Sequence, residues 1–387
     1  MPTVNVNIQP AILNWALGQT NEEKLGEKLV ENIKHWLDGS KCPTFNQIEE
    51  FSKKAHIPIG YFFLQTPPKE QVELLEYRTV DSIESTNPSR DLLDTIHEME
   101  TVQEWMADYK KELYYDKVEF VGSLNGITDI KVIVNKIRMD LGLDLEWYKE
   151  CDGSSKAFTK VRGLLEKCGI LVMVNGIVGK NTHRALNLNE FRAFAIVNEW
   201  APLIFINGAD SSGGRLFSLF HELTHLWLGK SDLYNDRKYS LNITNSIEVI
   251  CNAVAGELMV PTEKFVENWK FNMNDDIYEK IGELSKLFRC SESVIARRAL
   301  DNRMIKKSVY DKVITCGIEH YLESRKERSS GGDYYRVVRS KLDGAFVRAL
   351  CESVNSGRTS YTEAYRLTNT TSKTFSEVAN GLGGVLW

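Results

Sequence analysis

Apolar residues recur at three- and four-residue steps along residues 91–113, DLLDTIHEMETVQEWMADYKKEL. This spacing gathers them on one side of a helix and leaves charged residues on the other. The apolar positions are Leu92, Leu93, Ile96, Met99, Val102, Trp105 and Met106. The pattern predicts one long amphipathic helix.

Strand-like segments join the helical ones between residues 151 and 270. AFTKVRGLLEKCG predicts a helix that ends at Gly169, and ILVMVNG predicts a strand after it. FRAFAIVNEWAPLIFING predicts two strands with a turn over residues 198–202. The glycine-rich SSGG, residues 211–214, then leads into another helix. A helix, a small mixed sheet and further helices predict an α+β fold.

Both ends of the chain carry helical patterns alone. Short helical patterns over residues 1–66 stop at the paired prolines 67 and 68, which suggest a boundary. The chain after residue 270 is predicted to be helical, with a glycine–serine break at residues 329–332. The predicted sections are a helical N-terminal domain (1–68), a helical connector (69–150), a central core (151–270) and a helical C-terminal region (271–387).

Composition is typical of a soluble globular protein. The chain has 387 residues, of which 42% are hydrophobic and 26% charged. No apolar run reaches the roughly 18 residues that a membrane helix needs. The first residues, MPTVNVNIQP, lack the basic and apolar segments of a secretory signal. The seven cysteines form no CxxC motif, so we expect reduced thiols in a cytoplasmic protein without a membrane partner.

The net charge of −5 argues against a protein that coats nucleic acid. Residues 1–66 carry six lysines, no arginine and seven acidic residues, whereas residues 286–341 carry fourteen Lys/Arg and seven Asp/Glu. If any part of the chain meets phosphate, the later segment is the better candidate. The alternative is an ordinary solvated helical surface.

The helix after SSGG contains HELTH, residues 221–225. On a helix, residues four apart project from the same side, so His221 and His225 can offer two imidazole nitrogens to one metal ion. Glu222 lies about 100° round the helix, where it can reach a water on the metal without being a ligand. Such a site needs a third protein ligand and an open fourth position.

The alternative is a chance match in a buried helix, because apolar residues surround the motif. These are Leu216, Phe217, Leu219, Phe220, Leu223, Leu226, Trp227 and Leu228. In such surroundings two histidines and a glutamate are costly unless they are satisfied. Metal coordination satisfies them, so we favour the metal site.

The next helix is the first place to seek the third ligand. It is predicted over residues 245–261, NSIEVICNAVAGELMVP, with Asn245 or Ser246 as its N-cap and Pro261 at its end. Weaker candidates are acidic residues outside this helix, since loop acids are common: Asp232, Asp236 and Glu263.

Two glutamates within that helix compete for the role, Glu248 and Glu257. They are nine residues apart, about 180° round a helix, so both cannot face one metal. Glu248 shares its side with Asn252 and Ala255, which leave room for a neighbouring helix. Geometry therefore favours Glu248 without excluding Glu257.

RLFSLFHELTHLWLG, with PLIFING before it and EVICNAVAGELMVP after it, resembles the ImmA/IrrE metallopeptidases over roughly residues 155–265. That family has HExxH and then a helix of the form E-x-x-A-N-x-F-A-x-x-L-L-x-P. The chain matches this helix at Glu248, Asn252, Ala255, Leu258 and Pro261. It departs from it, each time to another apolar residue, at Cys251, Val254 and Met259.

The resemblance implies a zincin-like core in which Glu248 is the third ligand of a Zn2+ ion. It also implies an endopeptidase that cuts a protein substrate, typically an Xre-type repressor, to switch gene expression. On the residues alone, manganese or iron could occupy the same ligands. The strand PLIFING is a candidate to hold an extended substrate by adding it to the sheet edge.

Two helical segments resemble DNA-binding modules. Residues 1–68 resemble an Xre/Cro-type helix-turn-helix domain, but the absence of arginine and the slightly negative charge indicate a degenerate copy. ELSKLFRCSESVIARRALDNRMI has a similar rhythm, in which Arg297 and Arg298 would face nucleic acid. Simple helical packing is the alternative for this second segment, and a structural or protein-recruiting role is the alternative for the first.

We therefore expect a zinc-dependent endopeptidase with His221, His225 and Glu248 as ligands and Glu222 as general base. One rival is a non-catalytic regulator or anti-repressor that uses the peptidase fold to bind a partner. The retained Glu222 speaks against it, because a pseudoenzyme is free to lose the base. A second rival is a toxin–antitoxin or phage-defence component with the same chemistry. Self-cleavage in the fused N-terminal domain is a minor hypothesis.

Overall fold

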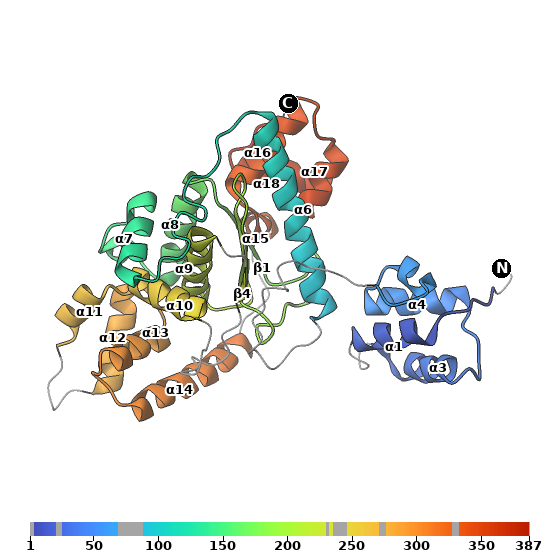
Figure 1. Cartoon of the computed structure of the whole chain (residues 1–387), viewed down its shortest axis with the longest axis horizontal. Coiled ribbons are helices and arrows are strands. Elements are labelled where there is room, and N and C mark those ends of the chain that lie inside the picture. The colour runs from blue at the N-terminus through green and yellow to red at the C-terminus, as the bar shows by residue number, and fades with distance from the viewer. Residues whose placement is uncertain are drawn as a thin grey trace. The chain divides into compact units, whose positions relative to one another are not determined.

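A computed structural model describes residues 4–20, 25–68, 88–229, 232–234, 246–270, 276–326 and 333–386 (Figure 1). The described residues fall into two compact units. The first extends to His97 and the second begins at Glu98. Helix α6 (Arg90–Glu112) spans this division and confirms the long amphipathic helix predicted over residues 91–113.

The first unit is helical, as predicted. Its elements before α6 are α1 (Pro10–Gly18), α3 (Glu27–Leu37), α4 (Phe45–Ala55) and the 3-10 helix η1 (Ile59–Phe63). Ile12, Ile33 and Phe51 are fully buried in its apolar core. Thr44 begins α4 by accepting a hydrogen bond from the backbone N–H of Gln47, whose side chain accepts one from the Thr44 N–H. The assignment as a helix-turn-helix domain stays a prediction.

The second unit contains a four-stranded mixed sheet with strand order β1-β3-β2-β4. The strands are β1 (Leu171–Asn175), β2 (Ala193–Ile196), β3 (Leu203–Asn207) and β4 (Asp232–Tyr234). β3 pairs in parallel with β1 and antiparallel with β2, and β2 pairs antiparallel with β4. The first three strands and the α+β class confirm the sequence prediction, whereas β4 was not predicted.

Both faces of the sheet are buried. Val172, Ala195 and Ile204 point to one face and join the core formed with α8 (Ser154–Lys167) and α9 (Ser212–Leu228). Phe194 and Phe205 point to the opposite face and stack with ring centroids 5.0 Å apart. Because both faces are covered, the strand sequences are continuous apolar runs and do not alternate between apolar and polar residues.

Further helices of the second unit precede and follow the sheet along the chain (Figure 1). Before it lie α7 (Ile130–Leu141) and η2 (Trp147–Glu150); after it lie α10 (Ser246–Met259), α11 (Thr262–Asn268), α12 (Ile277–Phe288), α13 (Glu292–Asp301) and α14 (Lys307–Lys326). One apolar core takes in Ile137 of α7 and Ile295 of α13 together with the sheet. This core therefore continues across the predicted boundaries at residues 150 and 270.

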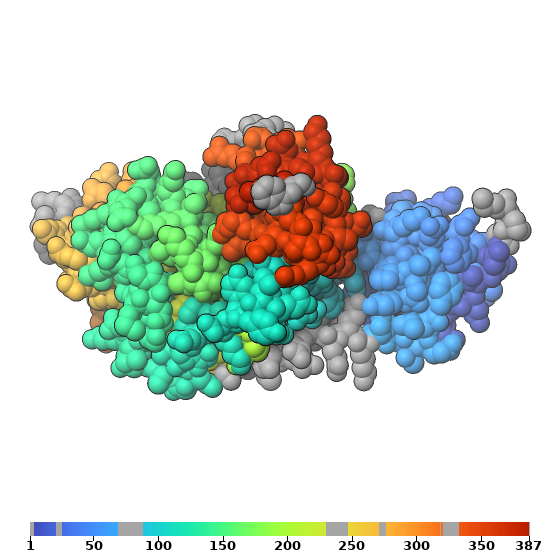
Figure 2. All heavy atoms as spheres, turned by 90° about the horizontal axis from the view of Figure 1, so that it is seen from above, coloured from blue at the N-terminus to red at the C-terminus, as the bar shows by residue number. Residues whose placement is uncertain are grey.

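The C-terminal helices are α15 (Tyr334–Lys341), α16 (Gly344–Asn355), α17 (Tyr361–Thr368) and α18 (Ser372–Gly381). They gather beside α6 (Figure 2). Phe346 of α16 meets Trp105 of α6 edge-on, with ring centroids 5.6 Å apart. Buried Asp343 caps α16 and accepts a 3.1 Å hydrogen bond from the Val172 N–H of β1. At Val172 the outer edge of β1 is therefore occupied by the chain itself, since the Val172 carbonyl oxygen also accepts a hydrogen bond from Arg162.

All seven cysteines are free thiols, as expected from the sequence. Among the described residues, no helix combines the length and the apolar character that crossing a membrane requires.

Candidate metal centre

Local sequence fixes both ends of α9, the helix that carries HELTH. Ser211 is its N-cap and accepts a 3.0 Å hydrogen bond from the Gly214 N–H. A side chain at residue 214 would bring its Cβ within 2.6 Å of the Asp210 carboxylate, so the second glycine of SSGG permits this tight start. Gly229, with φ of 69°, ends the helix in the left-handed conformation.

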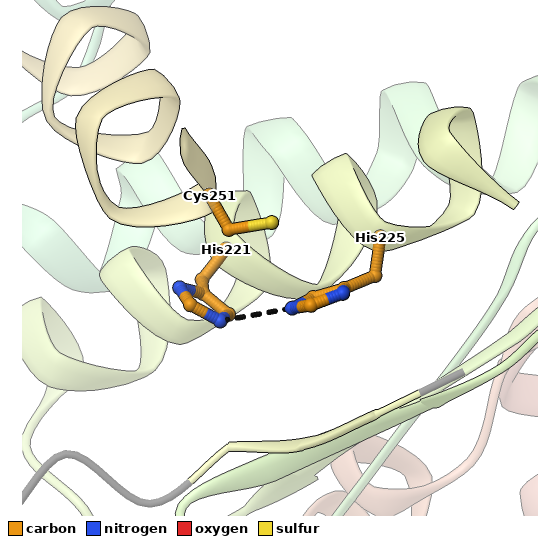
Figure 3. A group of neighbouring side chains, drawn as sticks. All are labelled: His221, His225 and Cys251. Atoms are coloured by element: carbon orange, nitrogen blue, oxygen red, sulfur yellow. Dashed lines mark hydrogen bonds between the residues drawn. The ribbon is translucent and has the colours of Figure 1, made fainter. Parts of the chain in front are cut away.

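His221 and His225 lie one turn apart on α9, and both are fully buried. Their Nε2 atoms are 3.1 Å from each other (Figure 3). The rings therefore present one nitrogen each to the same small volume, as the i, i+4 spacing predicts.

Glu248 reaches the same volume from α10, which packs along α9. One carboxylate oxygen, Oε2, is 3.2 Å from Nε2 of His221, and the other, Oε1, is 3.2 Å from Nε2 of His225. The structure thus brings together the two histidines and the glutamate that the sequence favoured.

These separations fit a metal ion at the centre. Ligands that are about 2.0–2.1 Å from a tetrahedral metal lie about 3.3–3.4 Å from one another. Glu248 Oε1 is buried and makes no hydrogen bond with proper geometry among the described residues, although the His225 nitrogen is only 3.2 Å away. A buried carboxylate oxygen without a well-formed hydrogen bond is costly, and a metal ion between it and the histidines would satisfy it.

Asn252 orients the first histidine. His221 Nδ1 lies 3.0 Å from Asn252 Oδ1. Because an amide oxygen can only accept, the proton of this ring is on Nδ1, and Nε2 keeps its lone pair for a metal. Sequence reasoning matched Asn252 to the family pattern without giving it a role. Its spacing of four residues from Glu248 was the available signal.

Burial and charge set the protonation of this group. Burial lowers the pKa of His221 below its usual value. For His225 burial acts in the same direction, but Cys251 and Glu248 outweigh it and raise the pKa well above its usual value. For Glu248, burial alone would raise the pKa, but the two imidazoles beside it, His221 first, outweigh burial and hold the pKa well below the usual range. The ionised carboxylate is the form of Glu248 that binds metal, and a histidine ring that carries two protons must release one when it becomes a ligand.

Glu222 follows His221 on α9 and is fully buried. Its charge reaches the site: burial raises the pKa of the Cys251 thiol, and the carboxylates of Glu248 and Glu222 raise it further against the opposing effect of His225. Cys251 belongs to α10, and its sulfur and one nitrogen from each of His221 and His225 all lie within 4.8 Å of one another (Figure 3). Sequence reasoning treated Cys251 only as an apolar replacement for alanine.

The competing glutamate, Glu257, lies elsewhere. Its carboxylate accepts hydrogen bonds from the Thr262 N–H at 2.9 Å and from the Thr262 hydroxyl at 2.6 Å, and it pairs with Arg298. Three further acidic residues were weaker candidates. Asp232 begins β4, Glu263 is exposed in the first turn of α11, and Asp236 lies outside the described residues.

The two arginines that were candidates for nucleic-acid contact make ion pairs within the protein. Arg298 is 12% exposed and its guanidinium pairs with Glu257. Arg297 pairs with Asp301 in the same helix at 3.0 Å. A role of these residues in DNA binding stays a prediction, and the Arg298 pair leaves little of that guanidinium for phosphate.

The prediction that PLIFING offers a sheet edge to a substrate was wrong. The segment forms β3, which is an interior strand with β1 on one side and β2 on the other. Its backbone groups are committed to these neighbours. Alternation and apolar content cannot separate an interior strand from an edge strand, since strand order depends on the connections between strands.

Comparisons with known proteins give one functional match. Residues 165–300 match the model of the peptidase M78 family, described as an IrrE N-terminal-like domain. This range includes the sheet, α9 and α10, and it supports a peptidase related to the ImmA/IrrE proteins. Residues 342–381 match a domain of unknown function (DUF8813). No curated protein and no solved structure matches the chain.

Proposed function

We propose that this protein is a zinc-dependent endopeptidase that makes limited cuts in a protein substrate. The observation that carries the proposal is the convergence of two imidazole nitrogens and one carboxylate at 3.1–3.2 Å, with a second buried carboxylate next to them on α9. The family match supports the peptidase reaction. The donor set, two nitrogens and one carboxylate, is typical of zinc peptidases.

Each residue has one task. His221, His225 and Glu248 hold the ion, and Asn252 keeps the His221 lone pair directed at it. A bound zinc ion supplies Lewis acidity, which polarises a carbonyl and makes water acidic near neutral pH. Glu222 accepts a proton from the attacking water and passes it to the leaving amine. Its full burial strengthens these interactions, because the surroundings have a low dielectric constant.

The substrate of this proposal is a protein segment in extended conformation, and the resemblance favours an Xre-type repressor. An extended segment can bind by adding to a sheet edge. The β1 edge is blocked at Val172 by Asp343, and β3 is interior. In the described part of the sheet this leaves the outer edge of β4, the end strand that contacts α9, as the place for the substrate backbone.

The test is cleavage of a mixed peptide library by the purified zinc-loaded chain. We expect the wild type to cut the library, Glu222→Gln to lose cleavage while it keeps zinc, and Glu263→Gln to behave as the wild type. Glu263 is the control because it is an exposed carboxylate in the first turn of α11, the helix that follows α10 along the chain. Equal cleavage by the wild type and Glu222→Gln would contradict the proposal. No cleavage by the zinc-loaded wild type would favour the non-catalytic regulator.

A further inference from the structure

Cys251 differs from the other buried cysteines in what its sulfur faces. It stands on α10 between Glu248 and Asn252, which both contact the histidines. Residues three apart on a helix share a side, so Cys251 projects where Glu248 does. Its side chain is fully buried, and Figure 3 shows it next to the two imidazoles, on α10.

We propose that Cys251 is a fourth protein ligand of the metal, which is then held by two imidazoles, one carboxylate and one thiolate. The inference rests on the metal site proposed above and adds a donor to it. The sulfur already lies within 4.8 Å of a nitrogen of each histidine. The usual pattern of the ImmA/IrrE helix has alanine here, which offers no donor.

Sulfur chemistry suits this position. Zinc binds cysteine sulfur at about 2.3 Å, a longer bond than the roughly 2.0–2.1 Å to nitrogen, so a sulfur ligand stands farther from its neighbours than an oxygen does. The thiol gives its proton to solvent when the metal–sulfur bond forms, since a coordinating thiol is deprotonated outright. Nothing is oxidised or reduced in this exchange.

A fourth protein donor would change the site in two ways. Catalytic zinc sites keep one position open for water or substrate, whereas four protein ligands close a site. Cys251 would therefore compete with water for that position, and the closed form would be a resting state. A thiolate would also favour zinc over manganese or magnesium, which prefer oxygen ligands.

The test is X-ray absorption at the zinc edge of the zinc-loaded full chain. We expect the wild type to show one sulfur at about 2.3 Å beside nitrogen and oxygen at about 2.0–2.1 Å. The sulfur should be lost in Cys251→Ala and in the size-matched Cys251→Ser. Cys168→Ala is the control and should keep the wild-type spectrum, because its thiol contacts the Asp140 carbonyl oxygen at 3.7 Å instead.

The outcomes separate this inference from the proposed function. A wild type that binds one zinc with a shell of nitrogen and oxygen alone would overturn the thiolate ligand and leave the peptidase intact. A sulfur shell that persists in both Cys251 variants would also overturn it. A wild type that binds no zinc would overturn the metal site itself. If the variants do not fold, a wild-type shell without sulfur still overturns the ligand, and a shell with sulfur supports Cys251, the cysteine that lies with the two histidines in the described part of the chain.

Discussion

The two ends of helix α10 place the same residue type in opposite situations. Near its start, Glu248 faces two buried imidazoles at 3.2 Å each. Near its end, Glu257 pairs with Arg298 and accepts two hydrogen bonds from Thr262. A guanidinium is always charged and satisfies a carboxylate permanently, whereas an imidazole can release its proton and share a metal with the carboxylate.

The difference comes from what each half of α10 packs against. The first half lies along HELTH in α9, and the end lies beside α13, where the Arg298 side chain passes within 3.6 Å of the position a Cβ of residue 256 would take. A carboxylate therefore acquires its role from the neighbouring helix. Replacing each glutamate in turn tests this comparison directly.

The largest expected effect is the loss of metal on replacing Glu248. Removing one of three protein ligands should lower zinc affinity by more than about 100-fold, since losing an outer-shell partner alone costs roughly 10–100-fold. Glu257→Ala is the matched control and should bind zinc as the wild type does. Competition against a chelator measures both affinities. Equal losses in the two variants would break the comparison.

Asn252→Ala should have the next largest effect at the metal end of α10. Without the acceptor at 3.0 Å, the His221 ring loses the contact that keeps its proton on Nδ1. We expect zinc affinity to fall roughly 10–100-fold while zinc still binds. The same chelator competition measures the change, and Asn252→Asp, which keeps an acceptor, should restore most of the affinity. Unchanged affinity in Asn252→Ala would contradict the orienting role.

At the other end of α10, Glu257→Ala should cost stability and leave the metal site intact. The change leaves a 12%-exposed arginine without its carboxylate partner. We expect the free energy of unfolding to fall by roughly 1–3 kcal/mol. Urea denaturation of the zinc-loaded protein measures it. Stability equal to that of the wild type would show that the ion pair contributes nothing.

The smallest effect is expected for Arg297→Ala. Its pair with Asp301 is partly exposed and lies within one helix. Such pairs contribute little, so the free energy of unfolding should change by less than about 0.5 kcal/mol. Urea denaturation measures this change together with that of Arg298→Ala, which should lose about as much unfolding free energy as Glu257→Ala. A larger loss of unfolding free energy in Arg297→Ala than in Arg298→Ala would contradict this ranking of the two ion pairs.

The predictable part of the site follows from local periodicity. The i, i+4 spacing of HELTH and the opposed positions of Glu248 and Glu257 are properties of single helices, and the structure brings together the three residues so favoured. The roles of Asn252 and Cys251 depend instead on how α10 docks on α9. The interior place of β3 depends on strand order in the same way. Pairing between segments distant in sequence decides these features.

The most direct test of the central claim is a crystal structure of the zinc-loaded protein with anomalous diffraction at the zinc edge. We predict one anomalous peak about 2.0–2.2 Å from Nε2 of His221, Nε2 of His225 and the Glu248 carboxylate. A peak at Glu257 or elsewhere on the chain, with the space between the two histidines empty, would contradict the account.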